Sequence, residues 1–261
     1  MSDLEEHFNN NEDINYKELP LYHTCDMDAA RVIFNSKKIS PSPCPKFLEN
    51  ILYLFLGKSS YKKNAEKTQS RYYPVSFCIN PKIKINILRS YPLDSGAIKE
   101  GIYEPIIAKE KFEVVKEQYN LGNQIKTCYK FIFSFFEKLE YYIKSVPFKS
   151  YTDSALPPHL YETKEIYDIY TQAYGERDVR SATIEVQSND VIDLNSHNVL
   201  TVFYPTVLQQ YNNTDFLNEN FMFEPLIYSE ARLAACSKYY DYIYEESQNI
   251  SIKYLDHCES N

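Results

Sequence analysis

The chain has 261 residues, 44% of them hydrophobic and 15% aromatic, so it can bury a substantial core and is not a disordered segment. Its 28 Lys and Arg against 36 Asp and Glu give a formal net charge of −8, which argues against a protein that coats nucleic acid by neutralising phosphates. No stretch reaches the roughly 18 apolar residues that span a bilayer, and the acidic start is unlike a signal peptide. We therefore expect a cytoplasmic protein with no membrane partner.

The cysteines offer no metal-binding pattern. There are 6 of them, and no two form the close C-x-x-C pair that is typical of structural zinc sites. In a cytoplasmic protein such residues are most simply buried thiols, so we expect no metal.

The N-terminal part predicts a leader, a strand and a helix. Residues 1–18 are rich in Asn, Asp and Glu and are expected to form a mobile leader. Residues 19–25 have the apolar pattern of a short buried strand that carries His23 near its end. Asp26 or Asp28 can accept hydrogen bonds from the free amides of the helix that follows. Its predicted buried face holds Met27, Ala30, Ile33 and Phe34.

Two further strands are expected at residues 51–56 and 73–79, with a basic segment between them. In this segment Lys58, Lys62, Lys63, Lys67 and Arg71 stand against only Glu66. By default such a run is an exposed charged face, and alternatively it contacts an anionic ligand.

The second half of the chain alternates helices, loops and strands. Residues 91–97 predict a turn-rich loop, and residues 111–115 a strand. A helix is expected over residues 124–144, where apolar residues recur every three or four positions. Residues 147–180 predict a long loop with a short helix inside it. Strands at residues 181–188 and 199–204 and a last helix near residues 229–247 complete an α+β domain, with residues 19–261 expected to form one unit.

Three short patches resemble ADP-ribosyltransferases of the diphtheria-toxin and PARP type. Leu21-Tyr22-His23-Thr24 resembles the histidine motif of this family, and residues 51–55 followed by Ser59-Ser60-Tyr61 resemble its tyrosine motif. Glu185, on a strand after a long loop, resembles the catalytic glutamate. The resemblance is to a bacterial, DarT-like toxin branch, and it implies a single domain with a central split antiparallel sheet, flanking helices and a long substrate loop.

The resemblance implies NAD as the donor substrate and assigns a role to each residue. Breaking the bond between nicotinamide and ribose develops positive charge on the sugar, which a carboxylate can stabilise. By resemblance this carboxylate is Glu185, while His23 holds a ribose hydroxyl and the backbone of Thr24 holds the nicotinamide amide. Tyr53 would line the pocket and Tyr61 would stack on the nicotinamide ring. Lys58, Lys62 and Lys63 would meet the pyrophosphate or an anionic acceptor.

The departures from the family pattern bear on the acceptor. The glycine expected after the histidine is Thr24, which is closer to bacterial relatives that modify DNA. Position 183 is Thr, so the Glu-x-Glu pattern of arginine-modifying toxins is absent. The implied function is mono-ADP-ribosylation of a nucleic acid or protein by a bacterial toxin or anti-phage effector. An antitoxin is a possible partner of such a protein.

Each residue also has a structural interpretation. His23 and Tyr53 could be core residues, Tyr61 could be a surface tyrosine, and Glu185 could be a solvated residue on an edge strand. Two alternative functions stay open beside the transferase: a binding or regulatory module without turnover, and NAD hydrolysis in which water is the acceptor.

Overall fold

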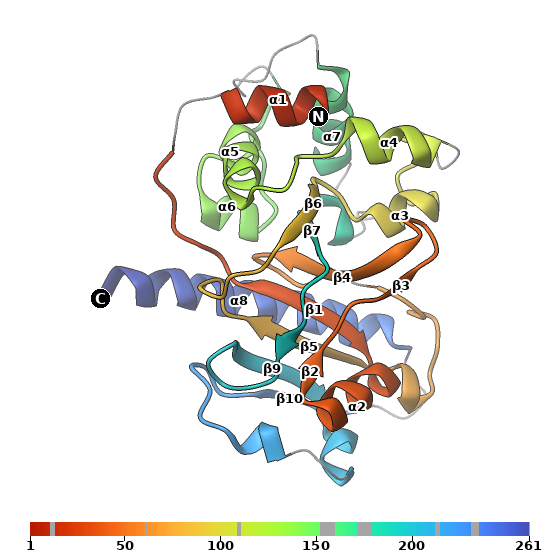
Figure 1. The fold of residues 1–261 in the computed structure, drawn as a ribbon, viewed down its shortest axis with the longest axis vertical. Coiled ribbons are helices and arrows are strands. Elements are labelled where there is room, and N and C mark those ends of the chain that lie inside the picture. The colour runs from red at the N-terminus through yellow and green to blue at the C-terminus, as the bar shows by residue number, and fades with distance from the viewer. Residues whose placement is uncertain are drawn as a thin grey trace. The chain divides into compact units, whose positions relative to one another are not determined.

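The computed structural model describes residues 1–10, 14–60, 62–108, 111–151, 160–171, 179–211, 215–230 and 235–260. The chain divides into two compact units, shown with their elements in Figure 1. The smaller unit combines Met1–Lys17 with Ile87–Gln187, and the larger unit combines Glu18–Asn86 with Ser188–Asn261. The chain is mixed α and β, as expected, but the division differs from the single unit predicted for residues 19–261.

A mostly antiparallel sheet organises the larger unit. Its strands follow the order β10 (Leu226–Tyr228), β9 (Val199–Pro205), β5 (Pro74–Ile79), β1 (Leu21–Asp26) and β4 (Glu49–Leu56). Only β10 and β9 are a parallel pair among them. Strand β3 (Ser42–Cys44) pairs with β4, and β2 (Lys38–Ile39) pairs with β8 (Ile192–Asp193). The central strands are rich in β-branched and aromatic residues, which suit a buried pleated surface.

Two helices cover opposite faces of this sheet. Helix α2 (Met27–Ser36) begins at Asp26, whose side chain accepts from the Ala29 amide at 3.0 Å, as predicted for a cap. Its Phe34 ring packs on Phe77 of β5, which is the register partner of His23. Because side chains alternate along a strand, Tyr22 points to the other face, where it contacts α8 (Ser237–Ser260).

The smaller unit is mainly helical and has an aromatic core. Its elements are α1 (Asp3–Asn10), β6 (Ile87–Tyr91), α3 (Ser95–Lys99), α4 (Phe112–Gln118), α5 (Ile125–Phe135), α6 (Leu139–Ile143), α7 (Tyr161–Thr171), the 3-10 turn η4 (Val179–Ala182) and β7 (Glu185–Ser188). Rings from separate helices meet in its core, as where Tyr170 of α7 packs against Phe131 and Phe135 of α5. Strand β7 is the neighbour of β6.

The N-terminal stretch is not simply a mobile leader. Residues 3–10 form α1, which packs against α5 and buries Leu4 and Phe8 completely. The polar composition concealed two apolar residues four positions apart, which lie on one face of a helix.

Two element predictions in the smaller unit were wrong. The helix expected over residues 124–144 breaks after Phe135, because Phe136 takes an extended conformation that packs its ring against Tyr142 and Tyr170. The strand expected at residues 111–115 is instead helix α4, which buries Phe112 and Val115 three residues apart.

The strand expected over residues 181–188 is shorter, because η4 occupies its first part. The strand predicted at residues 199–204 is confirmed as β9. The last helix starts and ends later than predicted, at Ser237–Ser260. None of the helices in the described part of the chain is long and apolar enough to cross a membrane.

The hydroxyl of Tyr22 connects β1 to α8. It donates to the Ser247 carbonyl at 2.9 Å and lies 2.9 Å from the Ser251 hydroxyl, and the Tyr22 side chain is fully buried. Tyr22→Phe should therefore reduce the free energy of unfolding by about 1–2 kcal/mol, because it removes a buried hydrogen bond and leaves polar atoms without their partner. Urea denaturation measures this change.

Tyr161→Phe is the matched control, because the Tyr161 side chain is 78% exposed. It should change the free energy of unfolding by less than about 0.5 kcal/mol. Equal effects of the two substitutions would contradict the role given to the Tyr22 hydroxyl.

Candidate functional site

His23 lies where β1 and β4 stop pairing. The ladder between these strands covers Leu21↔Leu56 and Tyr22↔Phe55, although both strands continue. The same register would place Thr24 opposite Tyr53. Instead, the His23 Nδ1 atom lies 3.0 Å from the Tyr53 carbonyl oxygen, so a side chain takes part in the contact between the strands.

This contact determines the state of the His23 imidazole. A carbonyl oxygen only accepts, so Nδ1 carries the hydrogen and donates it. Burial lowers the pKa of His23 below its ordinary value of 6.5, and the bond to the Tyr53 carbonyl opposes this shift. The neutral ring then has Nε2 as an acceptor, which can bind a hydroxyl of a ligand.

A chain of buried hydroxyls fixes the segment after β4. Thr24 Oγ1 donates to Ser76 Oγ at 2.7 Å and lies 2.7 Å from Ser59 Oγ. Because the single Thr24 hydrogen is used on Ser76, Ser59 donates to Thr24. The Ser59 amide donates to Ser247 Oγ of α8 at 2.9 Å, which anchors this segment to the helix.

Ser60 differs from its neighbour. Its hydroxyl is buried and has no hydrogen-bond partner among the described residues, whereas the Ser59 hydroxyl is engaged. An unsatisfied buried hydroxyl is costly, so it indicates a place where a ligand group can bind.

The tyrosine and lysine predictions have different outcomes. Tyr53 is half-buried on β4, and its hydroxyl lies 2.8 Å from Cys44 Sγ. Tyr61 lies outside the described residues.

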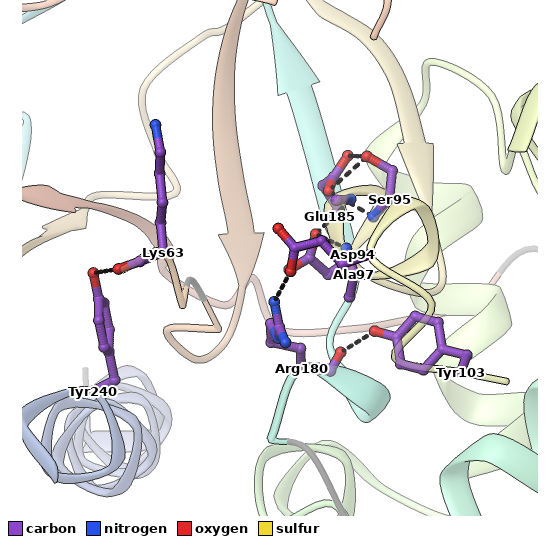
Figure 2. A network of polar contacts seen from close by, with 10 residues as sticks. Lys63, Asp94, Ser95, Ala97, Tyr103, Arg180, Glu185 and Tyr240 are labelled. Carbon is purple, nitrogen blue, oxygen red and sulfur yellow. Dashed lines mark hydrogen bonds and ion pairs between the residues drawn. The ribbon is translucent and has the colours of Figure 1, made fainter. Parts of the chain in front are cut away.

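Lys58 is fully buried, so it does not belong to an exposed basic face. Lys62 forms an ion pair with Asp241 at 2.7 Å, whereas Lys63 is exposed and its carbonyl accepts from the Tyr240 hydroxyl (Figure 2).

Glu185 is the centre of a polar cluster in the smaller unit. Its side chain is only 1% exposed, which rules out the interpretation as a solvated residue on an edge strand. Figure 2 shows its carboxylate directed toward Ser95, at the turn into α3. The Ser95 amide donates to Oε2 at 3.0 Å, and the Ser95 hydroxyl lies 2.8 Å from Oε1. Gln187, two residues along β7, donates its amide hydrogen to Oε1 at 2.5 Å.

Two tyrosines hold the chain that leads into β7. The Tyr142 hydroxyl accepts from the Ile184 amide at 3.1 Å, next to Glu185. The Tyr103 hydroxyl donates to the Arg180 carbonyl at 3.2 Å, as Figure 2 also shows. These bonds fix the backbone from which Glu185 projects.

The surroundings of Glu185 favour its protonated form. Burial, and to a smaller extent the nearby Asp94 charge, raise the pKa of Glu185 from 4.5 to about 8. The hydrogen bonds from Gln187 and Ser95 act in the opposite direction and favour the carboxylate. The carboxyl group is thus able to change its charge near neutral pH.

Sequence reasoning missed the partners of Glu185. Residues 91–97 were expected to be only a turn-rich loop, yet Asp94 caps α3 there and Ser95 contacts Glu185. Gln187 could have been found, because strand alternation already places it on the same face as Glu185. Ser95 precedes Glu185 by 90 positions, and no local signal links them.

The larger unit contains a separate cavity of about 430 Å³. Residues 82–85, 190–193, 197 and 198 line it, and it includes none of the predicted site residues.

Five of the cysteines are buried, as expected, and Cys258 is half-buried. Within the described ranges, no group of His, Cys, Asp and Glu could hold a metal ion.

Comparisons with known proteins identify no relative. No protein-family model, no curated protein and no solved structure matches the chain.

The state of His23 leads to a pH prediction. Because the pKa of His23 is lowered in the folded protein, the unfolded chain takes up the proton first, and His23 should reduce stability as the pH falls below 6.5. The ring protons of His23, assigned by comparison with His23→Gln, should titrate in the nuclear magnetic resonance spectrum with a midpoint below 6.5. A midpoint above 6.5 would contradict the neutral, half-buried imidazole.

Glu185 should have the opposite effect on stability. The pKa of Glu185 is raised in the folded state. Its contribution to the stability of the fold is therefore fully present below pH 4.5 and is lost as the pH rises through about 8. Glu185→Gln removes this charge, so the variant should gain stability relative to the wild type between these two pH values. Denaturant titrations at pH 5 and pH 8 measure the difference, and a constant difference would show that Glu185 is charged throughout.

Proposed function

We propose that this protein is an enzyme that cleaves the bond between nicotinamide and ribose in NAD and transfers ADP-ribose to a macromolecule. The observation that carries the proposal is the buried Glu185 carboxyl group, whose two oxygens are held by the Ser95 and Gln187 donors. A fully buried carboxyl group with a raised pKa is unusual for a residue that serves only stability.

Glu185 would stabilise the positive charge that develops on the ribose. An oxocarbenium-like transition state needs a nearby negative charge in a site with little water, where electrostatic interactions are strong. The nicotinamide ring of NAD carries a positive charge, and a cation close to a carboxyl group favours loss of its proton. Binding of the substrate would thus help to produce the carboxylate that the reaction needs.

His23 would bind a ribose hydroxyl through Nε2. The bond from Nδ1 to the Tyr53 carbonyl orients the ring and keeps Nε2 as an acceptor when the ring is neutral. Of the two serines in the tyrosine motif, Ser60 is the better candidate for contacting NAD, because the Ser59 hydroxyl is engaged by Thr24. The backbone of Thr24 would hold the nicotinamide amide, as the family resemblance implies.

The acceptor would be a nucleic acid or a protein. Lys63 is exposed and could contact an anionic acceptor, whereas Lys58 is buried and Lys62 is paired with Asp241. The proposal therefore rests on a smaller set of surface lysines than the sequence suggested. Tyr53 and Tyr61 would form the wall and the stacking surface for nicotinamide.

The test is incubation of the purified chain with NAD labelled in the adenine ring, together with protein, RNA or DNA from bacterial cells. The wild type should release nicotinamide and label one of the three fractions. Glu185→Gln should reduce the rate by about 10²-fold or more, because it removes the charge that stabilises the transition state. His23→Ala should also weaken activity, mainly by raising KM.

The assay separates the alternatives. Release of nicotinamide with no labelled macromolecule would identify water as the acceptor and make the protein an NAD glycohydrolase. Absence of both products would overturn the proposal and favour a binding or regulatory module. Ser90→Ala serves as the control, because Ser90 is a buried serine that bonds the Gly122 carbonyl, and this variant should keep wild-type activity.

A further inference from the structure

Ser95 and Gln187 hold Glu185 from two different parts of the chain. Ser95 uses both its amide and its hydroxyl, and the hydroxyl lies within 3.1 Å of each carboxylate oxygen. Gln187 adds a third donor to Oε1. All these groups are buried, with Ser95 at 2% and Gln187 at 0% exposure, so water does not compete for the contacts.

Gln187 makes this contact at a cost to its own side chain. Its Oε1 atom is buried and has no hydrogen-bond partner among the described residues. A buried amide that satisfies only one end stabilises a fold less than an apolar side chain of similar shape. The amide is therefore better explained by its donor contact with Glu185 than by packing.

We propose that Ser95 and Gln187 are positioning residues, which fix the direction of the Glu185 carboxylate and favour its charged form for the reaction. The inference rests on the proposed function, because it assigns Glu185 as the group that stabilises the developing charge. It adds two residues outside the histidine, tyrosine and glutamate motifs.

The donors of Ser95 and Gln187 favour the charged form of Glu185. Donors placed on a carboxylate stabilise it relative to the neutral acid, which has one fewer acceptor position. Burial and the Asp94 charge raise the pKa of Glu185 to about 8, and the Ser95 and Gln187 bonds limit this rise. Loss of either residue should raise the pKa further, so that less carboxylate is present at neutral pH.

The test uses Gln187→Met and Ser95→Ala, each compared with the wild type at a series of pH values. The Glu185 carboxyl group is followed by infrared difference spectroscopy against Glu185→Gln, in the absence of NAD. Its titration midpoint should move upward by about one pH unit in each variant. NAD cleavage at pH 7 should fall about tenfold, and most of it should return at higher pH, because a one-unit shift changes the carboxylate fraction tenfold.

Gln187→Met should fold with unchanged or higher thermal stability, because it removes the unsatisfied Oε1 atom. Ser95→Thr keeps the hydroxyl and should restore the wild-type midpoint and pH profile. Ser90→Ala again serves as the control, and its Glu185 midpoint should not move.

Two outcomes distinguish this inference from the proposed function. An unchanged midpoint in both Gln187→Met and Ser95→Ala would overturn the inference, even if the wild type cleaves NAD. A shifted midpoint in the two variants, together with a wild type that cleaves no NAD, would support the role of Ser95 and Gln187 in holding the carboxylate and would overturn the proposed function. Should Gln187→Met fail to fold, Ser95→Ala decides, because it leaves the Ser95 amide bond in place.

Discussion

A buried tyrosine hydroxyl has to find an acceptor, and in this chain the acceptor is often a backbone carbonyl far away in the sequence. Tyr22 reaches Ser247, Tyr228 reaches Pro74, Tyr103 reaches Arg180 and Tyr170 reaches Pro92. Each bond joins two segments within one of the compact units, and the ring fills the space between them. The chain has 25 tyrosines and no tryptophan, so tyrosine is the aromatic residue that supplies such bonds. The candidate site depends on such tyrosine bonds. The Tyr103 and Tyr142 hydroxyls hold the backbone at Arg180 and Ile184, just before Glu185.

The buried polar atoms that lack a hydrogen-bond partner also point to the candidate site residues. Among the described residues, the buried side-chain atoms without a partner are Ser60 Oγ, Gln187 Oε1 and Arg31 Nε. Ser60 belongs to the tyrosine motif and Gln187 contacts Glu185, so two of these atoms adjoin residues chosen from the sequence for their chemistry. Native proteins tolerate few such atoms, and those that remain are often found where a ligand binds or where local rules are relaxed for function.

The sequence predicted the elements with strong local patterns and missed those whose form depends on distant contacts. The strands around His23, Tyr53 and Phe77 and the cap at Asp26 followed from apolar runs and turn residues. The break at Phe136 could not be predicted, because the apolar spacing continues through it and only the rings of Tyr142 and Tyr170 explain the extended backbone. For the candidate site, Glu185 and Gln187 share a strand face and could be read together. Ser95 could not, because its contact with Glu185 depends on the tertiary fold.

The order of the chain has a consequence for synthesis on the ribosome. The smaller unit is complete once residue 187 has emerged, whereas the larger unit needs both its first segment and the end of the chain. Strand β5 pairs with β9 through Cys78↔Thr201, and the Tyr22 hydroxyl finds its acceptor only when Ser247 is present. Until then β1 and β5 expose apolar surface that a later segment must cover, which is the kind of surface that chaperones bind. Because the chain emerges sequentially from the ribosome, the unit containing Glu185 can fold before the unit containing His23.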